Sequence, residues 1–327
     1  MAEVGGWKVL KSWNGHVSQH RNRVTCCAWN HDGSLLASGS IDRTVRFWSA
    51  DGSLRATLQG HQGDVECVAW NHDGSLLASG SSDGELRLWK PDGTHVTTLF
   101  PGISSCTPPA GLIRPPRDPA AVVCCAWNHD GSLLAVGTAN STFRLYAPDG
   151  TVVTVLKERL ATCCAWNQDG SVIATGCVDA TVRLWRTDGT LIAELEGHED
   201  EVFCCAWNND GKLLASGDGA DTVLLWNPDG MFLVGKLVGH EDSLICCAWN
   251  HDGSLLASGA HDNTLRLWRS DGTLVATLAD GGGDGGVKDL PMCCAWNHDG
   301  SILAAGYDED GTLRLWHDTG VAAIESK

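Results

Sequence analysis

A block of fourteen residues, CCAWNHDGSLLASG at 26–39, recurs along the chain with few changes. Its tryptophan marks seven copies, at Trp29, Trp70, Trp127, Trp166, Trp207, Trp249 and Trp296. The copies are 39 to 57 residues apart, and a period near forty is typical of architectures in which each repeat is one supersecondary unit. We therefore expect seven similar units that stack on one another.

Each unit contains four short apolar runs separated by turn residues. In the first unit the runs are 24–29, 35–38, 44–48 and 54–58. They are too short for helices, and β-branched residues and Trp enrich the first and third runs, as in strands. Asp-Gly between the runs indicates hairpins, because Gly tolerates the positive φ of a tight turn. Each unit is predicted to be a four-stranded antiparallel meander that is apolar on both faces and must pack against a neighbour.

The segment 7–16 (WKVLKSWNGH) resembles the end of a unit, such as 54–61. We predict that residues 8–13 supply the outer strand of the seventh unit. That pairing would close the ring and cover strand edges that otherwise invite aggregation. Residues 321–324 are the alternative for the same position.

Most units carry Gly-His before the first strand, Ser/Thr-Gly in the second, Asp in the following turn and Trp in the third. Over residues 7–320 this pattern resembles the WD-repeat β-propellers. The resemblance implies an all-β fold, a seven-bladed β-propeller of four-stranded antiparallel blades, forming a single domain over 1–327. It also implies that His, Ser/Thr, Asp and Trp of a blade form a buried hydrogen-bonded tetrad.

Three blades carry the tetrad residues. They are Ser38, Asp42 and Trp48 in the first blade, His61, Ser79, Asp83 and Trp89 in the second, and His240, Ser258, Asp262 and Trp268 in the sixth. The histidine of the first blade is either His16, which follows Gly, or His20, which has the usual spacing to the first strand. The fifth blade has His198, Ser216 and Trp226, with its acid expected at Asp221.

The remaining blades depart from the pattern. The third has Val136, Asn140 and Tyr146, so its network is expected to be lost. The fourth keeps Thr175, Asp179 and Trp185 but has Lys-Glu-Arg at 157–159 in place of Gly-His. The seventh has Ala305 and one extra residue before Trp316. Because each hydrogen bond contributes about 1 kcal/mol net, we expect blades three, four and seven to be the least rigid.

Composition limits the partners. The formal net charge is -17, from 23 basic and 40 acidic residues, which opposes binding to nucleic-acid phosphates. No apolar run approaches about 18 residues and the N-terminus has no signal-peptide core, so no membrane contact is expected. We expect a cytoplasmic or nuclear protein.

Twelve of the fifteen cysteines form six adjacent pairs on the first strands. Neighbours in a strand point to opposite faces, so a pair is not a chelating unit. We interpret the cysteines as packing residues of a protein in a reducing compartment, and we predict no metal or cofactor. Cys106, in a loop, is expected to be the most reactive.

Two insertions interrupt the repeat, at 100–121 and 279–291. The first is rich in Pro and the second in Gly, and each is either tolerated surface length or a contact for a partner. Five turns contain histidine, at His31, His72, His129, His251 and His298. We interpret these histidines as solvated turn residues on a wide ring, too far apart to share a metal.

In the resembled family, three positions of each blade face the upper opening: the two flanking the first residue of the first strand, and the one before the turn Asp. The residues at these positions that we predict to bind a partner are Arg23, Asp64, Glu66, Val178, Glu201, Phe203, Ile245, His261, Met292 and Tyr307. In the fifth blade the third position is Ala220. Asp64 and Glu66 form an acidic sector, and apolar residues beside charge are typical of a peptide-binding hot spot.

These features predict a non-catalytic scaffold that binds a peptide or partner domain, preferably a basic one, on its upper face. One alternative is an enzyme in the central channel, although no nucleophile elbow, phosphate-binding loop or His-Glu-x-x-His motif occurs. The other is a recently amplified or engineered propeller without a dedicated ligand, which the near-identity of the units favours.

Overall fold

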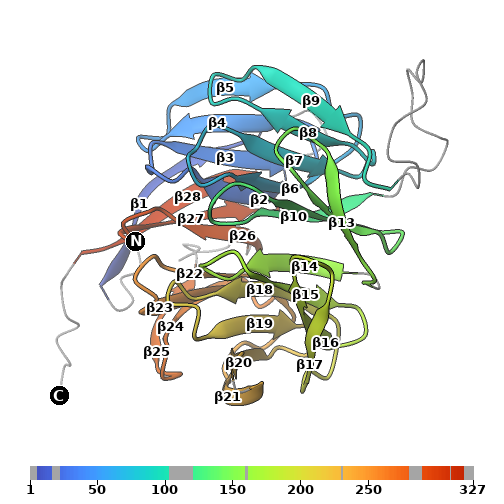
Figure 1. The fold of residues 1–327 in the computed structure, drawn as a ribbon. Coiled ribbons are helices and arrows are strands. Elements are labelled where there is room, and N and C mark those ends of the chain that lie inside the picture. Colours follow the sequence, from blue (N-terminus) through green and yellow to red (C-terminus); the bar gives the residue numbers. More distant parts are fainter. Residues whose placement is uncertain are drawn as a thin grey trace.

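The structure is a computed structural model that describes residues 6–16, 23–102, 121–158, 161–229, 231–279, 289–309 and 311–319. These residues form 28 strands in seven four-stranded antiparallel sheets, and none of them is helical (Figure 1). The first strands of successive sheets contact one another in turn, and the first strand of the last sheet contacts that of the first sheet. The predicted seven-bladed β-propeller is confirmed. No helix in the described part of the chain is long and apolar enough to cross a membrane.

The blades are numbered in chain order. Blades 1 to 3 are built from β2 (Val24–Trp29), β3 (Leu35–Ser40), β4 (Val45–Ser49) and β5 (Leu54–Leu58); β6 (Val65–Trp70), β7 (Leu77–Ser81), β8 (Leu86–Trp89) and β9 (His95–Leu99); and β10 (Val122–Trp127), β11 (Leu134–Thr138), β12 (Phe143–Tyr146) and β13 (Val152–Leu156). Blades 4 and 5 are built from β14 (Ala161–Trp166), β15 (Val172–Cys177), β16 (Thr181–Arg186) and β17 (Leu191–Glu196); and β18 (Val202–Trp207), β19 (Leu214–Asp218), β20 (Val223–Asn227) and β21 (Phe232–Leu237). Blades 6 and 7 are built from β22 (Leu244–Trp249), β23 (Leu255–Ala260), β24 (Thr264–Arg269) and β25 (Leu274–Ala279); and β26 (Pro291–Trp296), β27 (Ile302–Tyr307), β28 (Thr312–Asp318) and β1 (Trp7–Asn14).

The N-terminal strand completes the last blade. β1 pairs antiparallel with β28, giving the order β1-β28-β27-β26. Trp7 is buried, and its ring packs edge-on against Trp296 with the centroids 5.5 Å apart. The predicted closure by residues 8–13 is confirmed. Residues 321–324, the alternative, lie outside the described residues.

The blades pack through their apolar faces. The side chain of Phe47 in blade 1 contacts Trp70 of blade 2 with ring centroids 5.1 Å apart. The glycine of Ser-Gly allows this close approach, because a Cβ at Gly39 would lie 2.6 Å from both Cys26 Sγ and Val65 Cγ1. Such a contact is far inside van der Waals distance, so a larger residue there would push blades 1 and 2 apart.

The cysteines line these packed interfaces as free thiols. None of the fourteen described cysteines forms a disulfide. Burial raises the pKa of the Cys26 thiol well above its usual value, so this group stays protonated and inert. The Cys26 thiol therefore acts as a small apolar packing group. Cys106 lies outside the described residues, as do 103–120 and 280–288, the larger parts of the two insertions.

Candidate functional site

The buried tetrads fix the loops that surround the upper opening. In blade 1, His16 Nδ1 donates to Asp42 Oδ2 at 3.0 Å, and its Nε2 accepts from Ser38 Oγ at 2.8 Å. The indole of Trp48 donates to the same Ser38 oxygen at 2.8 Å. This donor pattern follows from Asp, which only accepts hydrogen bonds when ionised. His16 therefore completes the first tetrad, and His20 lies outside the described residues.

The predicted tetrads of blades 2 and 6 also form. His61 lies 3.2 Å from Asp83 and 2.8 Å from Ser79, and His240 lies 2.8 Å from Asp262 and 2.7 Å from Ser258. Trp89 and Trp268 each donate to the serine of their blade at 2.8 Å.

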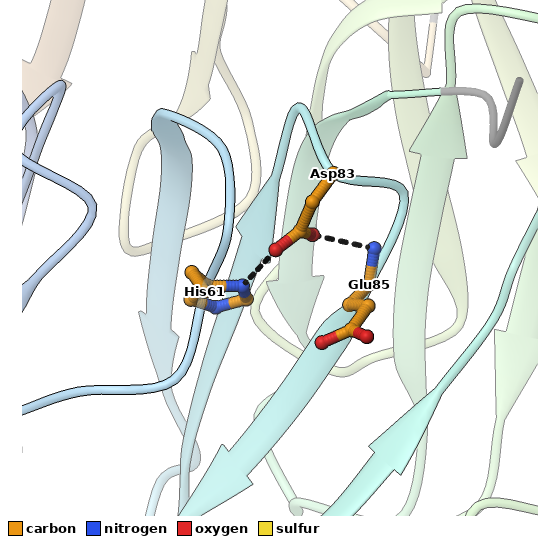
Figure 2. Close-up of side chains that lie close together, drawn as sticks. All are labelled: His61, Asp83 and Glu85. Carbon is orange, nitrogen blue, oxygen red and sulfur yellow. Dashed lines mark hydrogen bonds and ion pairs between the residues drawn. The ribbon is translucent and has the colours of Figure 1, made fainter. Parts of the chain in front are cut away.

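The group formed by His61, Asp83 and Glu85 brings three possible metal ligands within 4.8 Å of one another (Figure 2). Both nitrogens of His61 are, however, engaged by Asp83 and Ser79. The Glu85 carboxylate accepts two hydrogen bonds from Arg87, at 2.9 and 2.6 Å. Burial alone would raise the pKa of Asp83, but hydrogen bonds from His61 and the Gln62 N–H outweigh it and lower the pKa to about 2. The arrangement in Figure 2 is thus accounted for as a structural tetrad.

Blade 5 has a complete tetrad with a different acid from the one predicted. His198 Nδ1 lies 2.8 Å from Asp218 Oδ2, and Trp226 donates to Ser216 at 2.7 Å. The prediction of Asp221 is wrong, because Asp221 takes the left-handed turn position (φ 62°) that Arg43 takes in blade 1 (φ 70°). Asp218 ends β19 and is buried beside the histidine.

In blade 4 a carboxylate, in place of the histidine, is the centre of the buried hydrogen-bond network. Glu158 is buried and accepts from Thr175 Oγ1 at 2.6 Å, Trp185 Nε1 at 3.0 Å and Arg183 Nη1 at 3.1 Å. Blade 4 therefore keeps a buried hydrogen-bond network although it lacks Gly-His. The expectation that this blade is less rigid because it loses hydrogen bonds does not hold. In the sequence, the signal for this carboxylate-centred network is a Glu three residues before the first strand of the blade.

Blades 3 and 7 lack the tetrad in the described residues. In blade 3 the serine position is the apolar Val136, and Asn140 instead donates to the Gly102 carbonyl at 3.1 Å. In blade 7 Ala305 replaces the serine, and the buried indole nitrogen of Trp316 has no hydrogen-bond partner among the described residues. Arg314 is buried in blade 7, 3.4 Å from Asp289 and 4.0 Å above the Tyr307 ring.

A backbone hydrogen bond identifies the positions at the upper opening. In each described case the N–H of the third position donates to the carbonyl of the first, as His261 does to Ser243 at 2.9 Å. In blade 5 the donor is Gly219, which bonds to Glu201 at 3.0 Å, and in blade 7 it is Asp308, which bonds to Leu290 at 3.1 Å. The predicted residues Ala220 and Tyr307 are therefore wrong for this position.

Tyr307 is 3% exposed and pairs with Pro291 inside the blade, so it has no surface to offer a partner. The extra residue of blade 7 lies in the turn after it. Tyr307 corresponds to Ser40 of blade 1, which also follows the Gly of its second strand. Asp308 therefore takes the place of Ile41, which precedes the turn Asp in blade 1.

The acidic sector includes a cation that is already paired. The guanidinium of Arg23 binds the carboxylate of Asp308 through both Nε and Nη2, the latter 2.6 Å from Oδ2. Burial raises the pKa of Glu66, and the nearby charge of Asp64 raises it further, while Arg23 lowers it. Arg23 thus lies among three carboxylates, and the sector as a whole carries negative charge.

A hollow of about 330 Å³ opens on blades 5 and 6. Its lining residues are Phe203, Ser243, Leu244, Ile245 and His261. Phe203 is 41% exposed. Three of the predicted contact residues, Phe203, Ile245 and His261, therefore meet in one place. Of the other apolar candidates, Val178 is exposed on blade 4 and Met292 is half-buried on blade 7, and neither lines the hollow.

Two residues near the hollow were not predicted. A Cβ at Gly219 would lie 2.8 Å from Asp200 Oδ2 and 3.3 Å from Phe203 Cε2. The missing side chain thus leaves space beside the phenyl ring, and it places the exposed carboxylate of Asp200 next to an apolar surface. The half-buried Glu201 follows Asp200 in the chain and adds a second acid to this edge.

The five turn histidines form a close array at the opposite end of the first strands. The imidazole centroids lie 4.4 Å apart for His251 and His298, 4.2 Å for His298 and His31, 3.9 Å for His31 and His72, and 3.9 Å for His72 and His129. The prediction of a wide ring is wrong, because the first strands of adjacent blades contact one another. The turns at their ends are therefore crowded together.

Two family models match this chain. The model of the "WD domain, G-beta repeat" matches residues 7–49, 52–90 and 272–317. The model of the "WDR19 first beta-propeller" matches residues 123–280.

Among curated proteins, the similarity is confined to short segments. "Protein HIRA" of Zea mays is 35% identical over 52 residues, 16% of this chain and 5% of that protein. "Protein ROOT INITIATION DEFECTIVE 3" of Arabidopsis thaliana is 47% identical over 47 residues, 14% of this chain and 10% of that protein. "Probable cytosolic iron-sulfur protein assembly protein 1" of Kluyveromyces lactis is 49% identical over 35 residues, 11% of this chain and 10% of that protein. The matched segments thus span a tenth or less of these three relatives, about the length of one blade.

Proposed function

Because the chain belongs to the family of WD-repeat β-propellers, we propose that it is a non-catalytic scaffold that binds a peptide or partner domain at its upper opening. Propellers of this family are commonly protein-interaction scaffolds. The observation that carries the proposal is the hollow lined by Phe203, Ile245 and His261 beside exposed carboxylates. We propose that residues 1–327 form a single domain.

The chemistry of the hollow favours an apolar anchor. Phe203 and Ile245 supply apolar walls, and the Ser243 hydroxyl already donates to the Gly219 carbonyl at 2.8 Å. Since that hydroxyl's hydrogen is used, the hollow gains most by burying an apolar side chain. Aromatic and aliphatic anchors in a pocket of this kind dominate the binding energy of many interfaces.

The charges favour a basic segment next to that anchor. Asp200 is exposed beside the hollow, and Asp64 and Glu66 lie in the acidic sector. With a net charge of -17, the chain attracts basic partners and repels the phosphates of nucleic acids. The free cysteines support function in a reducing compartment, such as the cytoplasm or nucleus.

The test is affinity capture from cell extract with the intact protein and with the double variant Phe203→Ala/Ile245→Ala. Phe232→Ala is the matched control, since Phe232 is 53% exposed on β21 and does not line the hollow. We expect the double variant to lose at least one partner that the wild type and the control retain. If all three proteins capture the same partners, the hollow is not the binding site.

The contribution of the acidic sector to partner binding is tested separately. For a captured partner, Asp64→Asn/Glu66→Gln should weaken binding at low salt and flatten its dependence on ionic strength, because exposed charges are screened by salt. An unchanged salt dependence would remove the acidic sector from the interface.

A further inference from the structure

The five imidazoles at the lower end of the first strands have a chemistry that the proposed scaffold function does not use. They form an unbroken array from His251 through His298, His31 and His72 to His129, with centroids 3.9 to 4.4 Å apart. The tetrad histidines have both nitrogens engaged. In contrast, none of the array histidines hydrogen-bonds another residue in the described ranges.

We propose that this array binds a divalent transition-metal ion such as Ni²⁺ or Zn²⁺, with imidazole nitrogens from adjacent blades as ligands and water completing the coordination. Imidazole is a preferred ligand of these ions. At metal–nitrogen distances of about 2.0–2.1 Å, two ligand nitrogens of a tetrahedral ion are about 3.3 Å apart. Neighbouring rings of the array have centroids 3.9 to 4.4 Å apart, so side-chain rotation can turn nitrogens of adjacent blades toward one ion.

The surroundings favour a cation. Each of the seven turns has an aspartate directly after the position of the array, at Asp32, Asp73, Asp130, Asp169, Asp210, Asp252 and Asp299. Hydrogen bonds from Ser34 lower the pKa of Asp32, and those from Ser75 lower the pKa of Asp73. These carboxylates are ionised at neutral pH, so the array lies in a negative field that attracts metal ions and repels anions.

His31 and His72 are also suited to metal binding at neutral pH, because a ligand nitrogen must be unprotonated. Burial lowers the pKa of His31, and the neighbouring His298, His129 and His251 lower it further, while Asp32 raises it. Burial and the neighbouring imidazoles of His129, His31 and His298 likewise lower the pKa of His72, which Asp73 raises.

The sequence itself shows which residues can replace the array histidines in a test of metal binding. Gln168 and Asn209 occupy the same turn position in blades 4 and 5, so the turn accepts a side-chain amide without losing its fold. The triple variant His298→Gln/His31→Gln/His72→Gln is therefore expected to fold, and it leaves no two neighbouring imidazoles in the array. The control is His95→Gln, which removes an exposed imidazole away from the array and from the hollow. Circular dichroism and the thermal midpoint check that the variants fold.

The measurement is isothermal titration of the full chain with Ni²⁺ alone, under reducing conditions. We expect the triple variant to bind Ni²⁺ at least about tenfold more weakly than the wild type, since even outer ligand partners affect affinity by 10–100-fold. The control should match the wild type, and binding should fall at about pH 5.5 as protons compete for the imidazoles.

Two results would overturn the proposal: a wild type that does not bind Ni²⁺, or a triple variant that binds as tightly as the wild type. In the second case the ion is held elsewhere, for example by thiols. Neither result bears on the upper opening, so the scaffold proposal is tested separately.

Discussion

Glu158 accepts the indole N–H of Trp185 at 3.0 Å, in a blade that lacks the histidine of its neighbours. The same carboxylate accepts from Thr175 and Arg183. A buried acid with three donors thus takes over the role of a neutral imidazole, and it draws a cation into the blade to balance its charge. The blades share an architecture, but they are held together by different chemistry.

The first prediction concerns this acid. Glu158→Ala should lower the free energy of unfolding by about 2–4 kcal/mol, because it leaves buried donors without an acceptor. Glu194→Ala is the matched control, since Glu194 also binds Arg183, at 2.9 Å, but is 46% exposed. An exposed pair contributes about 1 kcal/mol or less. Urea unfolding measures both, and equal losses would contradict the structural role of Glu158.

The acid of blade 5 is tested by a pair of identical substitutions. Asp218→Asn should destabilise the protein by about 2 kcal/mol, because it removes the charge from a buried hydrogen bond to His198. Asp221→Asn should have almost no effect, since Asn tolerates the left-handed conformation of that exposed turn position. Thermal and urea denaturation give the comparison. A larger loss for the second variant would restore Asp221 as the tetrad acid.

The tetrads should make stability depend on pH in two stages. Burial lowers the pKa of His16 below its usual 6.5, so the unfolded chain takes up a proton first and stability falls as pH drops below about 6.5. Burial alone would raise the pKa of Asp42, but hydrogen bonds from His16 and Thr44 outweigh it and hold the pKa at about 2. The stability from this carboxylate is therefore present above its ordinary value of 3.8 and is lost as pH falls toward 2.

Urea midpoints measured across this range test both stages. In Asp42→Asn the loss between about pH 4 and pH 2 should be smaller than in the wild type, because one titrating carboxylate is gone. If Asp42→Asn loses as much stability as the wild type between about pH 4 and pH 2, Asp42 does not contribute to the acid-dependent loss.

The closing strand should contribute to the stability of the whole ring. Trp7→Ala should cost about 3–5 kcal/mol, the usual loss when a buried aromatic side chain is truncated. Leu10→Ala on the same strand is the control, because Leu10 is 50% exposed at the bulge of β1. Thermal unfolding distinguishes them, and similar midpoints for both variants would mean that β1 adds little to the ring.

The amino-acid sequence by itself determined the number of blades, their strands and the strand that closes the ring. These follow from local patterns: a period near forty, apolar runs bounded by Asp-Gly, and an N-terminal segment that matches the last strand of a unit. The tetrads of blades 1, 2 and 6 were predictable for the same reason, apart from the choice of His16, since the spacing within a blade is nearly constant.

Only the tertiary structure decided which side chains face each other where that spacing changes. Tyr307 ends β27 and is buried opposite Pro291, and the half-buried Asp308 that follows it binds Arg23. In blade 5 a residue at the strand end, Asp218, takes the place of a turn acid as the partner of His198. The distance between the first strands of adjacent blades could not be predicted from the sequence either. His31 and His72 are 41 positions apart in the chain, yet their rings lie 3.9 Å apart. The reason is that closure of the propeller brings the first strands of all blades close together. The radius of the propeller cannot be predicted from any local sequence pattern.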